Sequence, residues 1–590
     1  MLFGHVIASL VMAPSTGTTR YAVLREDGVG GEGDDESSGV HADDTDDAPV
    51  PFWDEARGQI NMALPVSLSM VCNRVLSLTS VAFVGHLGAL PLAAAALATT
   101  LGNVSGNSVM VGMASASSTI GGQAFGARHY SKLGDVLQRC LLILTLACVP
   151  IAFVWANATE VLLKLGQSTE IANLSGVYMR CLTPGLLFYA WNISVQTYMQ
   201  SQRITKPSAV AGVVAAVFHV PLNYLFIFQF GWGYKGAAIA TSTSNGVVLA
   251  MNVGYLRFWK KDGVDDDDKT SLRTPRENTT TWTGWSVSAA TSEWRPFLRL
   301  ALPGILMMAE WWASELNIIL AGWLPDPERN VAAVSIFQIT NALAFMFPIG
   351  FSVAALTRVS NFLGARAPMS AKFASDVAFK MILVVEVIIS LVILSVKDVW
   401  AELYTSDTKV IKLVSKLLTP LAIYTAFDGA LCVATGTIKA CGKQWVAGPV
   451  VLFSYYVVGI PLAYWLAFSL GKGAMGLAIG ATVGTMLHSV LIIAVVWRTD
   501  WGLEARRAAE RVGGPGDLEN SERKEQKVSG ETRLEHEKKS NLGWVKGEND
   551  GGIPRGETLL PSIAEVELTD VNSDDVKAGK MSSSNERRAK

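Results

Sequence analysis

The stretch that decides the fold is LRLALPGILMMAEWWASELNIILAGWL, residues 298–324. It is long enough to cross a bilayer, because about 20 mostly apolar residues suffice for one helical crossing. Yet its central portion, MMAEWWASELNII (307–319), holds Glu310 and Glu315. An acid at bilayer depth is energetically costly and is usually kept for a function. The stretch therefore predicts a membrane-spanning helix with functional acids.

Apolar runs of this kind recur along the whole chain. It has 590 residues, of which 50% are hydrophobic and 17% charged, and its mean hydropathy is +0.31. We expect about twelve helical spans, since helices satisfy their own backbone hydrogen bonds in lipid. The expected spans are 58–84, 89–116, 136–156, 171–197, 208–230, 235–257, 296–323, 331–358, 376–396, 409–438, 445–468 and 473–497.

Short motifs recur at a nearly constant offset. ALP stands at 63–65 and 301–303, and GAR stands at 126–128 and 364–366, so both pairs share one spacing. LTP recurs at 182–184 and 418–420, at almost the same spacing. Six helices per repeat is an even number, so both repeats enter the membrane from the same side. The predicted fold class is an all-α membrane protein with twelve transmembrane helices in two six-helix lobes related by a parallel repeat.

The charged segments mark the domain boundaries. We expect a disordered tail at 1–56, an N-lobe at 57–257, a polar linker at 258–294, a C-lobe at 295–498 and a disordered tail at 499–590. Basic residues in short loops favour the cytoplasmic side. They predict that both tails and the linker are cytoplasmic, from Arg128, Lys132, Arg139, Arg203, Lys206, Arg358, Arg366, Lys372, Lys439 and Lys443.

Composition and motifs exclude several classes of function. The net charge is −2, and no P-loop, kinase-like set, or metal-spaced Cys/His cluster is visible in the sequence. The six cysteines lie within or beside expected spans and indicate no disulfide framework. We therefore expect no cofactor, no bound metal, no nucleic-acid partner and no enzyme activity.

The repeat makes the intramembrane acids asymmetric. Glu310 aligns with Cys72, and Asp428 of the tenth span aligns with Asn192. The C-lobe thus carries acids where the N-lobe is polar but neutral. Glu310 and Glu315 are five residues apart, about 140° around a helix, so we expect one to face a central opening and the other its own lobe.

This pattern suits competition between a proton and a cation. A carboxyl in an apolar pocket holds its proton more tightly, and a cation that binds only the charged form must displace that proton. We interpret Glu310, Asp428 and Glu315 as coupling and substrate-binding candidates. The alternative for each acid is a protonated carboxyl that only bonds a neighbouring helix. Further candidates for the cavity wall are Asn192, Tyr189, Trp311 and Gln338.

Other residues in the spans are less informative. Glu386 is a fourth intramembrane acid, but it has no repeat partner and no motif around it. Pro65 and Pro303 occupy equivalent places in the first helix of each repeat, where proline kinks a helix. Such kinks are compatible with bending during alternating access and equally with a static bend.

Several longer motifs, taken together, resemble one family. The chain resembles the multidrug and toxic compound extrusion (MATE) transporters, especially the eukaryotic type, over about residues 55–498. The motifs are VGHLG (84–88), GQAFGARHYSKLGDVLQR (122–139), PLNYLFIF (221–228), AEWWASE (309–315), RVSNFLGA (358–365) and FDGAL (427–431).

The resemblance implies a twelve-helix transporter that exports organic cations or small amphipathic compounds in exchange for protons. It implies coupling and substrate-binding roles for Glu310 and Asp428, and it matches Glu315 to the second acid of the EWWxxE motif. Two positions depart from family patterns. Ser118 replaces an acid often found before GQ, and Ser80 stands where many prokaryotic members carry a coupling Asp. The second departure argues against coupling through the first lobe.

The leading prediction is a monomeric proton-coupled antiporter of the plasma membrane or a vacuole-like membrane, with a small molecule, protons and the lipid bilayer as partners. A flippase for lipid-linked or amphipathic substrates is the nearest alternative, and it would favour a more basic cavity. A membrane enzyme would need a nucleophile–base pair or a metal set, which we do not find. A channel fits the repeat less well, because two related lobes favour alternating access.

Overall fold

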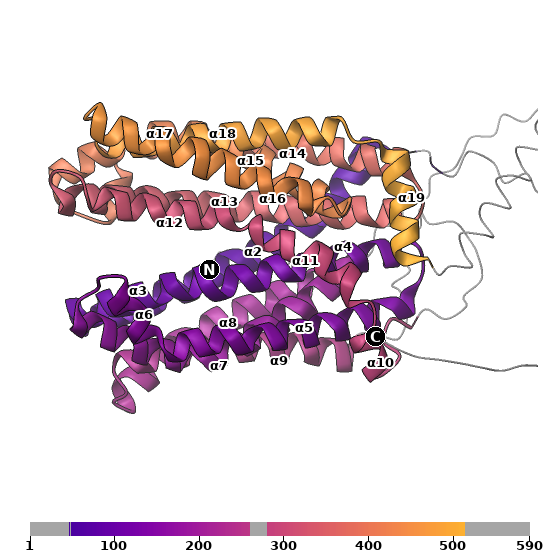
Figure 1. Cartoon of the computed structure of the whole chain (residues 1–590), viewed down its shortest axis with the longest axis horizontal. Helices are drawn as coiled ribbons and strands as arrows, with labels where there is room; N and C mark the ends of the chain where they lie inside the picture. The colour runs from indigo at the N-terminus through magenta and orange to yellow at the C-terminus, as the bar shows by residue number, and fades with distance from the viewer. Residues whose placement is uncertain (1–46, 48, 260–279, 514–590) are drawn as a thin grey trace, which may run out of the picture. The chain divides into compact units, whose positions relative to one another are not determined.

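The computed structural model describes residues 47, 49–259 and 280–513 (Figure 1). Within these ranges every regular element is a helix, as the apolar runs predict. The first half contains α2 (Phe52–Gly85), α3 (Ala89–Gly102), α4 (Ser108–Gly126), α5 (Tyr130–Ala156), α6 (Ala158–Lys164), α7 (Thr169–Ser201), α8 (Lys206–Tyr224) and α9 (Tyr234–Gly254). A π-helical turn at Asn103–Asn107 joins α3 to α4.

The second half has the same plan with more interruptions. It contains α10 (Val287–Thr291), α11 (Trp294–Leu306), α12 (Ala309–Ala321), α13 (Pro327–Gly364), α14 (Pro368–Val396), α15 (Thr408–Ala440), α16 (Gln444–Leu452), α17 (Ile460–Tyr464), α18 (Ala474–Trp497) and α19 (Trp501–Val512). The π-helical turn Phe453–Gly459 connects α16 to α17 within one long helical segment.

In the described part of the chain, nine helical segments are long and apolar enough to cross a membrane. The other three expected spans are also helical. Two of them are α7 and α9, which carry more polar side chains, and the third is divided between α11 and α12. The all-helical fold class predicted from the sequence is therefore confirmed.

The internal repeat is visible in the backbone. Arg128 and Arg366, the last residues of the two GAR motifs, have φ angles of 61° and 59°. Gly233 and Gly473, which precede α9 and α18, both have φ of 56°, a left-handed conformation that glycine adopts without steric cost. Matching left-handed turns at matching places are what a structural repeat requires.

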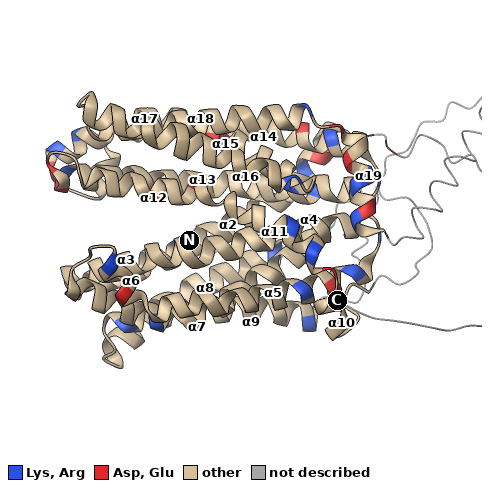
Figure 2. Ribbon diagram, in the orientation of Figure 1, with Lys and Arg blue, Asp and Glu red and all other residues tan. Residues whose placement is uncertain are grey.

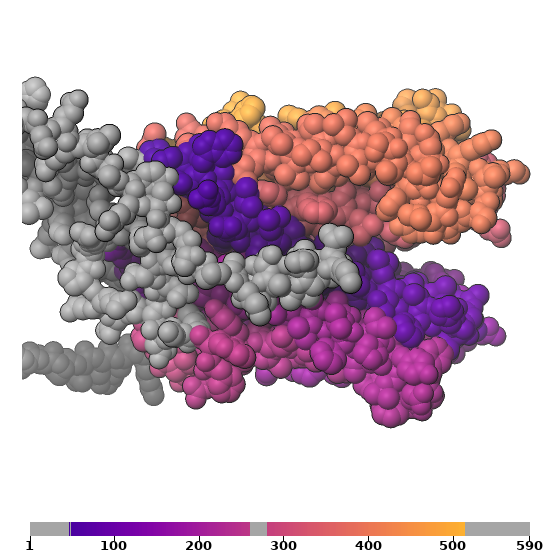
Figure 3. Space-filling model, turned by 180° about the vertical axis from the view of Figure 1, so that it is seen from behind, coloured from indigo at the N-terminus to yellow at the C-terminus, as the bar shows by residue number. Residues whose placement is uncertain are grey.

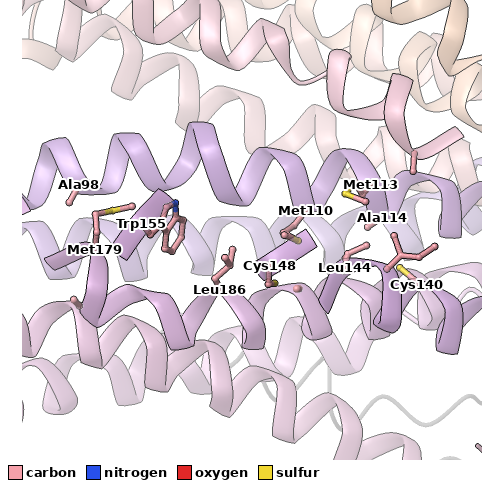
Figure 4. Packing of buried hydrophobic residues seen from close by; sticks show 14 of the residues in the cluster. Ala98, Met110, Met113, Ala114, Cys140, Leu144, Cys148, Trp155, Met179 and Leu186 are labelled. Atoms are coloured by element: carbon pink, nitrogen blue, oxygen red, sulfur yellow. The ribbon is translucent and has the colours of Figure 1, made fainter. Parts of the chain in front are cut away.

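The first helix of each half packs into the core of the other half. The largest buried apolar cluster is built from first-half helices, as in the packing of Met110, Leu144 and Trp155 (Figure 4), but it also contains Phe297 and Ala301 of α11. In return, Met62 and Ala63 of α2 are buried with Phe351 and Ala354 of α13. Figure 3 shows the start of α2, in indigo, lying against second-half helices.

Close backbone approaches join the halves near one end of the helices. Gly126 lies against the carbonyl of Asn361, and Gly364 lies against the carbonyl of Gln123, so close that a Cβ atom would clash at either position. The two glycines are the first residues of the two GAR motifs. The end of the molecule near these glycines is also where α10, α19 and many Lys and Arg residues lie (Figure 2).

Three expectations about the segments that flank the spans are wrong in part. The predicted disorder from residue 499 does not hold for α19, because Ala505, Ala508 and Val512 bury an apolar face against the helices. The predicted linker is not wholly solvated, because Gln138 of α5 donates to the carbonyl of Gly284 at 2.9 Å and accepts from the amide of Ser286 at 2.7 Å. The predicted disorder of residues 1–56 is likewise wrong at its end, because α2 begins at Phe52 and Asp47 accepts from the amide of Met369 at 2.9 Å. Residues 1–46, 48, 260–279 and 514–590, including the DDDDK stretch at 265–269, lie outside the described residues.

Candidate functional site

Glu310 lies in the first turn of α12, directly after a break in the seventh span. The chain leaves α11 at Leu306 and resumes a helix at Ala309, shortly beyond Pro303. The equivalent proline, Pro65, lies inside the unbroken α2. The expected equivalence of the two prolines therefore does not extend to the helix shape. The break places the Glu310 carboxylate near a helix N-terminus, which favours negative charge.

The side chain of Glu310 faces the interior of the second half. It is 16% exposed, and its Oε2 lies 3.6 Å from Nδ1 of His488 in α18. The phenol of Tyr455 also lies within interaction range of this carboxyl. Tyr455 belongs to the π-helical turn, where its hydroxyl lies 2.9 Å from that of Thr485. The neighbouring Tyr456 donates to the carbonyl of Ala309 at 3.0 Å, so this turn holds the start of α12.

Asp428 lies in α15 and is almost fully buried, with 3% exposure. Its carboxyl is within electrostatic reach of Glu310 and of Glu386 in α14. Oδ1 of Asp428 and Oε1 of Glu386 have no hydrogen-bond partner among the described residues. Glu386 packs directly against Gly429, where a Cβ atom would clash with its carboxyl group. The structure thus brings three acids together, including one that the sequence analysis set aside.

Glu315 faces a different neighbour. The charge opposite Glu315 is Arg74 of α2, a basic residue inside the first span. Between the two glutamates, Gln338 of α13 donates to the carbonyl of Ser314 at 3.0 Å and fixes α12 against α13. Glu310 thus lies beside side chains of its own half, whereas the charge that acts on Glu315 comes from Arg74 of the other half.

A narrow pocket lies beside the acids. It is bounded by α12, α15, the π-helical turn, α17 and α18. Its lining combines apolar groups with phenols, a hydroxyl and an amide, and it includes Ala313, Ser314, Asn317, Tyr424, Tyr455 and Ile460. Asn317 Oδ1 is buried and has no hydrogen-bond partner among the described residues. Its free volume is about 10 Å³, the space of about one water molecule, so this conformation does not hold an organic substrate there.

The polar candidates of the first half are held in their own networks. Asn192, the repeat equivalent of Asp428, accepts a hydrogen bond from Asn252 at 2.9 Å. Ser80 lies 2.9 Å from His219 and 3.1 Å from Thr241. Tyr189 packs against the first-half core. Neither Asn192 nor Tyr189 is therefore brought to the three acids.

Trp311 is 36% exposed and makes an edge contact with Phe345 of α13.

Two ionisable residues near the acids were missed by the sequence reasoning. His488 and Arg74 are single ionisable residues in otherwise apolar spans, the same signal that identified the acids. Applying the intramembrane-charge rule to basic residues and histidine would have found both.

Comparison with known proteins agrees with this architecture. The MatE family model matches twice, at residues 65–225 and 304–465, so its two matches are spaced much as the repeated motifs are. Protein DETOXIFICATION 16 of Arabidopsis thaliana is 35% identical over 463 residues, covering 78% of this chain and 91% of that protein. Multidrug and toxin extrusion protein 1 of Danio rerio is 32% identical, covering 79% of this chain and 76% of that protein.

The solved structures agree as well. The crystal structure of the eukaryotic MATE transporter AtDTX14 matches with a TM-score of 0.72 and 30% identity, over 78% of this chain and 99% of that one. A Vibrio cholerae MATE transporter in its bent form matches with a TM-score of 0.63 at 21% identity, over 78% and 99%, which supports the fold alone. Because the family model matches twice and relatives that are 32–35% identical cover more than three quarters of the chain, the chain belongs to the MatE family of MATE membrane transporters.

Proposed function

We propose that this transporter is a secondary-active antiporter that exports organic cations, xenobiotics or metabolites in exchange for protons by alternating access. The observation that carries the proposal is the arrangement of Glu310, Asp428 and Glu386 around the interior of the second half. Asp428 and Glu386 are buried and Glu310 is largely buried, and carboxylates within electrostatic reach of one another in such an interior favour neutralisation by protons or by a cationic substrate.

The asymmetry between the halves supports a single coupling region. In the first half, the matching polar groups are neutral amides and hydroxyls that bond one another, such as Asn192 with Asn252. In the second half, carboxylate oxygens of Asp428 and Glu386 lack partners within the described residues. Unsatisfied buried oxygens are costly unless a proton or ligand occupies them at some stage of the cycle.

A flippase for lipid-linked or amphipathic substrates is the alternative, and basic residues in the cavity would favour it. Arg74 is a basic side chain at membrane depth, but its charge faces Glu315. It therefore does not offer an unopposed positive charge for a phosphate-bearing head group. Lys439 of α15 also faces Glu310, but the four acids Glu310, Glu315, Asp428 and Glu386 outnumber these two basic groups, which favours a cationic substrate.

We also propose the orientation expected from the sequence, with the N-lobe at 57–257 and the C-lobe at 295–498. Lys443, after α15, pairs with Glu504 of α19 at 3.1 Å, and His129, after α4, lies 3.2 Å from the carbonyl of Val512 at the end of α19. These loops therefore lie at the end of the helices that carries α19, where Lys and Arg residues gather (Figure 2). By the positive-inside rule this end is cytoplasmic, and so are both tails and the linker. The membrane is the plasma membrane or a vacuole-like membrane, and the transporter acts as a monomer.

The test is transport in proteoliposomes with an imposed pH gradient and no sodium. Tetraethylammonium is a suitable labelled probe because its positive charge does not titrate. Wild type should concentrate it against its gradient, while Glu310→Gln and Asp428→Asn should abolish pH-driven uptake. Glu402→Gln, an exposed residue outside the long helices, is the matched control and should behave as wild type.

Two outcomes would contradict the proposal. Uptake by wild type that requires a sodium gradient and ignores the pH gradient would replace the proton by sodium. Equal pH-driven uptake by wild type and Glu310→Gln would show that this carboxyl is structural. If wild type moves no cation of any tested class but does translocate a labelled amphipathic lipid, the flippase alternative is correct.

A further inference from the structure

His488 is a buried histidine inside the last long helix, α18 (Ala474–Trp497). Its side chain is 2% exposed, and its Nδ1 has no hydrogen-bond partner among the described residues. The ring makes an edge contact with Tyr455, with centroids 5.5 Å apart. The same Nδ1 lies 3.6 Å from Oε2 of Glu310. An imidazole nitrogen that lacks a partner and points at a carboxyl is available to share that carboxyl's proton.

The other buried histidine shows the contrast. His219 of α8 is fully buried, but its Nε2 lies 2.9 Å from the Ser80 hydroxyl and its Nδ1 lies 2.8 Å from the Ser244 hydroxyl. Both ring nitrogens of His219 therefore have neutral hydrogen-bond partners, which accounts for its burial. A structural explanation of that kind does not account for His488.

We propose that Glu310 and His488 hold one proton between them, and that this shared proton is the one that a cationic substrate displaces. The inference rests on the proposed antiport and adds a specific second residue to the coupling site. In the loaded state the proton lies on the carboxyl with a neutral imidazole, or on the imidazole with a carboxylate. Both forms are neutral overall, which suits a buried site.

The exchange step balances one proton against one cation. When the substrate cation approaches, the shared proton leaves to water. The Glu310 carboxylate then pairs with the cation, and His488 remains neutral. Net charge in the site is therefore unchanged by the exchange. His488 is a positioning residue here, because it acts through Glu310 and need not contact the substrate.

Other ionisable groups surround the Glu310–His488 pair and contribute to its electrostatic environment. Tyr455 contacts it from the π-helical turn, and Tyr424, Asp428 and Lys439 face it from α15. Beyond Asp428 lies Glu386 of α14. Of the described acids, Glu310 is the one that lies within 4 Å of the His488 ring nitrogens. This geometry selects Glu310 as the proton-sharing partner.

The test measures how protons compete with binding of labelled tetraethylammonium to the purified full-length transporter. Wild-type binding should weaken as the pH falls, because protonation of the pair removes the carboxylate. His488→Asn removes the imidazole's protonated form and its acceptor nitrogen, so the proton is held less tightly. The pH of half-maximal binding should therefore move down by about one unit, a tenfold change in proton affinity.

Controls separate this role from structural damage. His86→Asn is the matched substitution on an exposed residue and should leave the midpoint unchanged. Binding at high pH should be nearly normal in His488→Asn, because the carboxylate is then free in both proteins. As an independent readout, nitrogen NMR of labelled histidine, with His488 assigned by difference against His488→Asn, should show a ring signal that changes in Glu310→Gln.

Failure of the shared-proton inference can be distinguished from failure of the proposed antiport. If wild type and His488→Asn have the same midpoint and the NMR signal of His488 ignores Glu310→Gln, the shared-proton inference is wrong while the antiport proposal stands. If wild-type binding does not depend on pH, or if Glu310→Gln binds with the wild-type pH profile, the proposed function fails and the inference fails with it.

Discussion

Glu55 and Glu293 occupy equivalent positions of the internal repeat, and each pairs with an arginine from the other half of the chain. Glu55 in α2 accepts from Nε of Arg358 in α13 at 3.0 Å and also from its Nη2. Glu293, directly before α11, lies 3.1 Å from Nη2 of Arg139 in α5. The two ion pairs thus tie the first long helix of each half to the opposite half.

Replacing the glutamate by glutamine at these equivalent positions should lower the stability of the protein by unequal amounts. The Glu55 side chain is fully buried, whereas that of Glu293 is 63% exposed. Glu55→Gln leaves Arg358 uncompensated and should cost about 3–5 kcal/mol of stability, because the remaining charge is largely buried. Glu293→Gln should cost less, about 1 kcal/mol, because the Glu293 carboxylate is largely solvated and Arg139, although buried, keeps its hydrogen bonds to the carbonyl and hydroxyl of Ser292. Thermal unfolding in detergent measures both, and equal losses would refute the role of burial.

The contact between Glu386 and Gly429 predicts a coupled pair of mutations. Gly429→Ala places a methyl group where the Glu386 carboxyl lies, so it should displace the acids and cost about 1–3 kcal/mol. Glu386→Ala removes the obstructing group and makes room for that methyl. In a double-mutant cycle, the penalty of Gly429→Ala should therefore largely vanish in the Glu386→Ala background. Additive losses of Tm would show that the two sites do not interact.

Arg74 and Glu315 should act on substrate affinity as a pair. Glu315→Gln leaves the positive charge of Arg74 without its opposing acid. Cation binding should then weaken by roughly tenfold, because an uncompensated like charge near the path costs on the order of 1 kcal/mol. Arg74→Gln combined with Glu315→Gln should restore much of the affinity. Binding of labelled tetraethylammonium tests this, and a double variant as weak as Glu315→Gln alone would contradict it.

Helix α19 should stabilise the junction between the halves. Arg511 donates to Gln123 of α4 at 3.2 Å and to the carbonyl of Cys441, after α15, at 2.9 Å. Arg511→Ala should lower stability by about 1–3 kcal/mol, because it leaves partly buried acceptors unpaired. Arg507→Ala on the same helix is the control. Its side chain is 48% exposed, so the change should stay within about 0.5 kcal/mol. Indistinguishable Tm values for the two variants would refute this role.

Much of the fold could be predicted because lipid imposes simple rules on sequence. Long apolar runs must become helices, and repeated motifs such as GAR must adopt repeated turns, as Arg128 and Arg366 do. Glu310 and Asp428 could be singled out because an acid in an apolar run is costly wherever it points. Two features were not predicted from the sequence pattern. They are the break in the seventh span after Leu306 and the ordered helix α19.

By itself, the sequence determined the helices, the two repeats and the presence of acids in the second half, because each depends on local composition and spacing. The tertiary structure decided which groups meet those acids. Glu310 and His488 belong to helices far apart in the chain, yet their side chains lie 3.6 Å apart in space, and the charge that acts on Glu315 comes from Arg74 of the other half. Such partnerships depend on which helix faces pack together, and packing is a property of the whole chain that no single segment encodes.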